Sequence, residues 1–150
     1  YNVYSLIHFI LNLYLYDTQT FYISIVLMTT TYETHIIAFL SCVNISIDKL
    51  SELDGIELGR DELLSDEKYK KIKEMIPQLK TIYSSSYMTA LQKTASSTHK
   101  YPVINILRQV LKTCGYNLNP KRVSNGYTKA GVKLYKRSFV IKQTSNLMQL

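Results

Sequence analysis

The segment 119–137, NPKRVSNGYTKAGVKLYKR, concentrates positive charge without a counter-charge. It holds six lysines and arginines and no Asp or Glu. Cations of this density neutralise phosphates, which is the main source of affinity in nucleic-acid binding. The phosphate contacts that we predict from this segment are Lys121, Arg122, Lys129, Lys133, Lys136 and Arg137.

A second set of polar side chains follows helical spacing just upstream. Pro102 suits the first turn of a helix and Gly115 its end, so we expect a helix over 102–114. Its buried stripe would be Val103, Ile104, Leu107, Val110, Leu111 and Cys114, and its polar face Asn105, Arg108, Gln109 and Lys112. Arg108 and Lys112 suit phosphate or guanine, and Asn105 and Gln109 suit adenine. The alternative is a plain solvated helix face.

The charged segment itself has the pattern of a β-hairpin. It is rich in Val and Tyr and carries two turn signals, Asn125-Gly126 and Lys129-Ala130-Gly131. We expect antiparallel arms at roughly 119–127 and 132–142, with the loop at 128–131. The alternative to binding is a basic, solvated edge that prevents sheet aggregation.

Aromatic residues interleave with the cations of this hairpin. Tyr127, Tyr135 and Phe139 are of the type that stacks on unpaired bases. More often such residues form the packed face of a hairpin. We expect the second, with Tyr135, Arg137, Phe139 and Ile141 on the more buried side.

Helices upstream must support the hairpin. Ser65 is a good N-cap for a helix that buries Tyr69, Ile72, Met75, Ile76 and Leu79, and Ser86 can begin a short helix with Met88, Leu91 and Ala95. The resulting order predicts an α+β fold, with a small helical core followed by a C-terminal basic β-hairpin, winged-helix-like. The expected divisions are 28–64 as N-terminal region with an acidic linker, 65–142 as the basic domain, and 143–150 as a frayed tail.

Charge divides the chain into halves. Residues 1–74 hold all 11 acids and six of the bases, whereas residues 75–150 hold the other 12 bases and no acid. Such a half repels itself until a polyanion binds. We expect the acidic stretch 48–67 to face away from the ligand.

The first 27 residues have a different composition from the rest. They contain no Lys, Arg, Glu, Gly, Pro or Ala, and the first Met is Met28. One interpretation is translated upstream sequence that is not native; the others are an apolar N-terminal helix packed on the rest, or a membrane anchor. Val3 to Tyr16 is interrupted by polar residues and falls short of the roughly 20 residues of a span, so we expect no membrane association.

Residue types for catalysis do not cluster. His8, His35 and His99 are isolated, and no phosphate-binding Gly loop, metal-ligand cluster or nucleophile motif is present. We therefore expect no enzymatic activity, no metal and no cofactor. Two distant cysteines indicate reduced thiols and an intracellular location.

Three stretches resemble a known group of proteins. They are LDGIELGRDELLSDEKYKKIKEMIPQLKTIYSSSYMTALQKTA, LRQVLK and NGYTKAGVKLYKR. Over roughly 53–141 they are similar to the small uncharacterised proteins of nucleocytoplasmic large DNA viruses. The resemblance implies an intracellular viral protein that acts near DNA, at a replication site in the host cell or in the virion. It implies no particular chemistry.

Together these patterns predict a non-enzymatic nucleic-acid-binding protein, with duplex DNA favoured over RNA. The alternative is a structural or interaction module whose basic half docks an acidic viral protein or a capsid surface. The sequence leaves the oligomeric state open.

Overall fold

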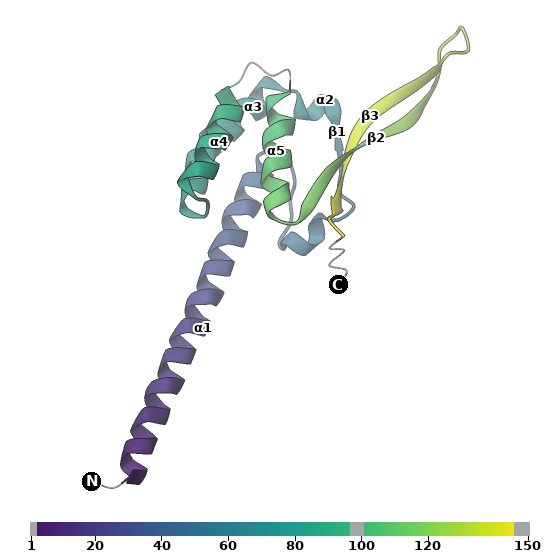
Figure 1. Cartoon of the computed structure of the whole chain (residues 1–150). Helices are drawn as coiled ribbons and strands as arrows, with labels where there is room; N and C mark the ends of the chain where they lie inside the picture. Colours follow the sequence, from purple (N-terminus) through teal and green to yellow (C-terminus); the bar gives the residue numbers. More distant parts are fainter. Residues whose placement is uncertain (1–2, 97–100, 146–150) are drawn as a thin grey trace. The chain divides into compact units, whose positions relative to one another are not determined.

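The computed structural model describes residues 3–96 and 101–145, and the chain divides into two compact units, Tyr1–Thr34 and His35–Leu150. Helix α1 begins in the first unit and ends in the second. The elements are α1 (Val3–Ser41), η1 (Leu50–Leu53), β1 (Glu57–Gly59), α2 (Arg60–Leu63), α3 (Asp66–Met75), η2 (Ile76–Thr81), α4 (Ser85–Ser96), α5 (Pro102–Thr113), β2 (Tyr116–Tyr127) and β3 (Lys133–Gln143). Figure 1 labels the α-helices and the strands. This confirms the α+β class.

The first unit consists of the apolar part of α1. Between Val3 and Tyr32 its only charged residue is Asp17, and its large apolar side chains are exposed. Serine and threonine hydroxyls donate back to carbonyls one turn earlier, as Thr18 does to Tyr14 and Ser24 does to Thr20, so polar residues fit within the helix. By length and composition α1 could cross a membrane, a test that core helices and signal sequences also pass.

The helical core of the second unit follows its local sequence. The Ser65 hydroxyl accepts a hydrogen bond from the Lys68 backbone N–H, as expected of an N-cap, and Asp66 and Glu67 occupy the first turn of α3. Beyond Met75 the chain tightens into the 3₁₀ helix η2, with Pro77 in its first turn. The short helix expected from Ser86 is α4, and its three predicted core residues are buried.

Helix α5 packs in the middle of this unit. Five of the six residues predicted for its stripe are buried, Cys114 is half-buried, and Ile106 is buried as well. The buried arc is wider than predicted because α5 contacts α3 and α4 as well as β2. Ile36, Phe39 and Leu40, from the last turns of α1, complete the core.

Three antiparallel strands form one sheet in the order β1-β3-β2. Glu57 to Gly59 pair with Val140 to Ser138, and the bonds continue from Gly55 N–H to the Ile141 carbonyl and from Ile141 N–H to the Ile56 carbonyl. The expectation of an acidic linker within 28–64 is therefore wrong, because η1, β1 and α2 occupy its acidic part. The core residues Leu53, Leu58 and Leu63 lie far apart among acids and glycines, so they form no recognisable hydrophobic pattern in the sequence. A three-residue strand is also too short to show a period.

Strands β2 and β3 form a long antiparallel pair whose far half extends beyond the helices (Figure 1). The loop lies where the sequence predicts it: Thr128 N–H bonds the Val132 carbonyl at 2.8 Å, and Gly131 N–H bonds the Thr128 carbonyl at 2.9 Å. Asn125-Gly126 is not a turn. Gly126, at φ +82°, lies in a register shift between Ser124 and Tyr127, which makes it a β-bulge.

The C-terminal boundary also differs from the expectation of a frayed tail over 143–150. Gln143 belongs to β3, and its backbone N–H donates to Asp54 Oδ1 at 2.9 Å. Residues 146–150 lie outside the described part of the chain.

Candidate anion-binding pocket

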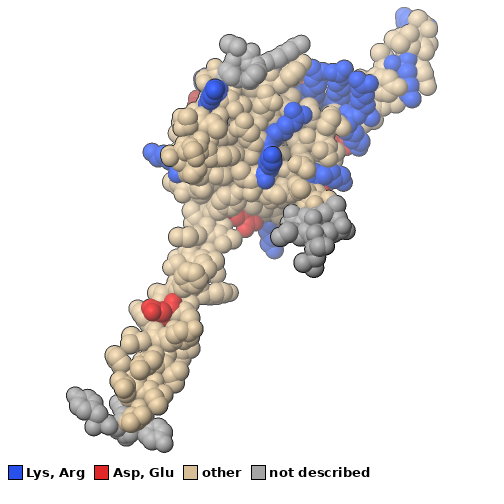
Figure 2. Space-filling view, in the orientation of Figure 1, with Lys and Arg blue, Asp and Glu red and all other residues tan. Residues whose placement is uncertain are grey.

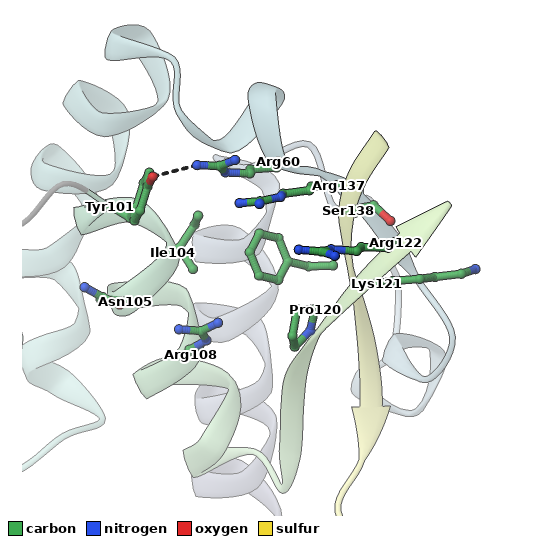
Figure 3. A pocket seen from close by; sticks show the side chains of 11 residues that line it. Arg60, Tyr101, Ile104, Asn105, Arg108, Pro120, Lys121, Arg122, Arg137 and Ser138 are labelled. Atoms are coloured by element: carbon green, nitrogen blue, oxygen red, sulfur yellow. Dashed lines mark hydrogen bonds between the residues drawn. The ribbon is translucent and has the colours of Figure 1, made fainter. Parts of the chain in front are cut away.

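Every arginine of the chain lies around one pocket. The sequence has four arginines and fourteen lysines. The pocket has a volume of about 460 Å³, and Arg60, Arg108, Arg122 and Arg137 all line it, whereas Lys121 is the only described lysine that does (Figure 3). None of the described lining residues is an Asp or Glu; the others are Tyr101, Ile104, Asn105, Pro120, Ser138 and Phe139. We call this the arginine pocket.

Two of the arginines face each other across the hairpin. Arg122 and Arg137 are Cα partners, and side chains of directly opposed residues lie on the same face of a sheet. On that face the next pair toward the core is Pro120 with Phe139. Phe139 is buried and its partner Pro120 is exposed, so the face changes from one buried aromatic residue to exposed arginines where β2 and β3 leave the helices.

Arg60 reaches the pocket because β1 pairs with β3. Gly59 is the partner of Ser138, so Arg60 emerges beside Arg137. Its Nη2 donates to the Tyr101 hydroxyl at 2.6 Å, and its guanidinium carbon lies 5.1 Å from the centre of the Tyr101 ring. These contacts fix the direction of the side chain, which points across the pocket in Figure 3. Neither Arg60 nor Tyr101 was among the predicted site residues.

The predicted polar face of α5 divides between two surfaces. Asn105 and the exposed Arg108 line the pocket, and the Arg108 guanidinium carbon lies 5.6 Å from the centre of the buried Phe139 ring. Gln109 instead donates through Nε2 to Thr94 Oγ1 of α4 at 2.9 Å, and its Oε1 is buried without a hydrogen-bond partner among the described residues. Lys112 is exposed in the last turn, outside the pocket lining. The prediction of one polar face of four residues is therefore wrong, because the Gln109 side chain hydrogen-bonds to α4.

The back of the hairpin carries an ion pair. Lys121 points away from the pocket in Figure 3, and its Nζ lies 3.0 Å from Glu57 Oε2. Glu57 Oε1 accepts the Ser138 hydroxyl at 3.0 Å. The Lys121 hydrogen bond, and then that of Ser138, holds the pKa of Glu57 below its usual range. Glu57, from the acidic stretch 48–67, thus contacts the back of the hairpin, and the expectation that this stretch faces away from the ligand stays a prediction.

The other predicted cations extend the positive surface outward. Lys136 lines a second, shallower cleft together with Arg60, Arg137 and one acid, Asp61. Lys133 lies 5.6 Å from the centre of the Tyr135 ring, and Lys129 is exposed in the loop. Figure 2 shows the lysines and arginines gathered over the base of the hairpin, with more toward its tip.

The hairpin aromatics do not share one environment. Phe139 is buried as expected, but Tyr135 and Tyr127 are 53% and 67% exposed. The expectation of a packed Tyr135 is wrong because the far half of the β2–β3 pair extends beyond the helices (Figure 1), and β3 is exposed from Lys133 to Arg137.

Comparison with known proteins identifies no relative. No family model matches the chain, and neither the curated proteins nor the solved structures contain a significant match. The similarity to viral proteins and the intracellular location therefore stay predictions. Within the described residues, no group of three or more His, Cys, Asp or Glu side chains is placed to hold a metal ion.

Proposed function

We propose that this chain is a non-enzymatic nucleic-acid-binding protein, with duplex DNA as its ligand. The observation that carries the proposal is the gathering of all four arginines around one pocket free of carboxylates among its described lining residues. Arginine presents a planar fork that pairs with phosphate through two parallel hydrogen bonds, and lysine does not. Of the fourteen lysines, Lys121 is the only described one that lines the pocket, so cationic surface alone does not account for where the arginines lie.

The arrangement of elements supports a winged-helix-like mode of binding. The short strand β1 follows α1 and precedes α2 to α5, α5 leads directly into the long β2–β3 hairpin, and the sheet order is β1-β3-β2. In that mode α5 enters the major groove and the hairpin follows the backbone as a wing. Arg108 and Lys112, one turn apart, are the exposed cations of α5, and Asn105 beside them offers an amide to a base edge.

One observation favours an acidic protein as a second candidate ligand. The outer part of the hairpin exposes Val123, Tyr127, Val132, Leu134 and Tyr135 beside its lysines. Exposed apolar residues of this kind, rimmed by charge, are typical of protein contacts. In this alternative the outer arm docks the partner, and the arginine pocket contributes little.

Fluorescence anisotropy with a labelled 20-base-pair duplex, at 50 and 200 mM salt, tests the proposal. Each neutralised phosphate contributes about 0.9 to the log–log salt slope, so four arginine contacts predict a loss of affinity of about 100-fold over this range. Alanine at Arg108, Arg122 and Arg137 should weaken binding and flatten the slope. The matched control replaces the exposed Lys80 and Lys93, which lie outside the pocket.

Charge reversal at Lys133 and Lys136 measures the contribution of the wing separately. Lys133→Glu with Lys136→Glu should weaken duplex binding while leaving the helical core folded, since both side chains are exposed. The proposal fails if the native protein does not bind the duplex at 50 mM salt. It also fails if the arginine and control variants bind alike.

A further inference from the structure

We infer that the arginine pocket is a site for a phosphomonoester or polyphosphate attached to a nucleoside. Two sources share this chemistry: the phosphorylated end of a nucleic-acid strand and a free nucleotide. The first source rests on the proposed function, whereas the second does not.

Charge matching is the first argument. Four guanidinium groups line a space of about 460 Å³, and no described lining residue is acidic. A phosphodiester in a strand brings one negative charge. A terminal phosphate carries about 1.5 to 2 charges at pH 7, and a di- or triphosphate carries more. Arg122 and Arg137 lie directly opposite each other and repel in the free protein. A multiply charged anion between them removes this repulsion, whereas a single phosphodiester removes only part of it.

Pre-organisation is the second argument. Arg60 is tied to the Tyr101 hydroxyl and ring, and Arg108 lies over the Phe139 ring. Arg108 belongs to α5, and Arg60 is the first residue of α2, directly after β1; the core holds these elements in place. A surface that only follows a flexible backbone has no need of such fixed donors, whereas a site for one compact anion gains affinity from them.

The uncharged part of the lining is the third argument. Ile104, Pro120 and Tyr101 contribute apolar surface to the pocket wall, and Asn105 places an amide among them. Pockets of this size with apolar walls and a few polar groups are typical of small-ligand sites. The plane of a guanidinium stacks well on a base. The pocket therefore has room for a nucleoside as well as for the phosphate.

The experiment uses the full chain and four kinds of probe. Duplexes labelled internally carry a 5′-phosphate, a 3′-phosphate or hydroxyl groups at both ends, and the four ribonucleoside triphosphates are titrated calorimetrically. We expect at least a tenfold preference for a phosphorylated end over the hydroxyl duplex, or binding of a triphosphate that competes with it. Arg137→Lys keeps the charge but loses the fork, so it should remove most of the preference. Lys80→Ala should leave the preference intact.

The outcomes separate the two proposals. Equal binding of all duplexes together with no triphosphate binding at 1 mM overturns the pocket inference and leaves the proposed function standing. Triphosphate binding without duplex binding supports the pocket and overturns the proposed function. Failure of every probe overturns both. Preference that survives in Arg137→Ala with Arg122→Ala also overturns the inference, because the anion then lies elsewhere.

Discussion

Removing one arginine of the opposed pair should stabilise the free protein while it weakens ligand binding. Arg122 and Arg137 are direct cross-strand partners, both are exposed, and two further arginines line the same pocket. Like charges at this position cost about 0.2–1 kcal/mol relative to a neutral pair. For a unit of about 100 residues that energy corresponds to a rise in Tm of roughly 1–5 °C in Arg137→Ala at low salt.

Salt separates the electrostatic effect from packing. At 0.5 M salt the Debye length is only about 4–5 Å, so the gain in Tm should disappear. Thermal unfolding followed by circular dichroism at 20 mM and 500 mM NaCl measures it, and anisotropy on the same samples should show at least a tenfold loss of affinity. Lys80→Ala should change neither quantity. A lower Tm of Arg137→Ala at both salt concentrations would refute the reasoning, since the arginine stem would then stabilise the hairpin by packing.

Three further predictions concern stability. Glu57→Gln should make the free energy of unfolding less dependent on pH in the acid range. Lys121 and Ser138 lower the pKa of Glu57, so this contact stabilises the fold above the unfolded-state pKa of about 4.3, and the stabilisation is lost as pH falls through the folded-state pKa. Urea unfolding from pH 7 to pH 3 measures the change. Phe39→Ala should cost about 3–5 kcal/mol in urea unfolding because the side chain is fully buried. Gly126→Ala should cost about 1–2 kcal/mol, since its φ of +82° is strained for alanine although the space is open; equal stability would show that the bulge rearranges.

Local patterns are the part of this fold that the sequence predicts well. The N-cap at Ser65, the buried stripe of α5 and the hairpin loop near Gly131 each depend on residues within about ten positions of one another. Propensity and periodicity act over that range. The limits of β2 and β3 were correspondingly accurate to within a few residues.

Contacts between distant segments account for what the sequence did not predict. Arg60 joins Arg108 and Arg137 only because a three-residue strand pairs with β3, and so short a strand has no readable pattern. Gln109 belongs to the same predicted polar face of the helix as Arg108, yet its side-chain amide donates a hydrogen bond to Thr94 on another helix. One signal in the sequence did exist. Arginine is much less frequent than lysine in this chain, and all four arginines line the pocket.

Lysine and arginine are expected to contribute differently to anion binding because their side chains differ chemically. Lysines on the outer hairpin supply a diffuse attraction that steers a polyanion and fades with salt. On the back of the hairpin, Glu57 pairs with Lys121 and reduces the charge of that surface. The pocket side has four guanidinium groups and no carboxylate among its described lining residues, and two of these groups are already positioned by Tyr101 and Phe139. The hairpin is therefore electrostatically two-sided, and a polyanion drawn by the lysines is expected to settle on the side where arginine forks can bind its phosphates.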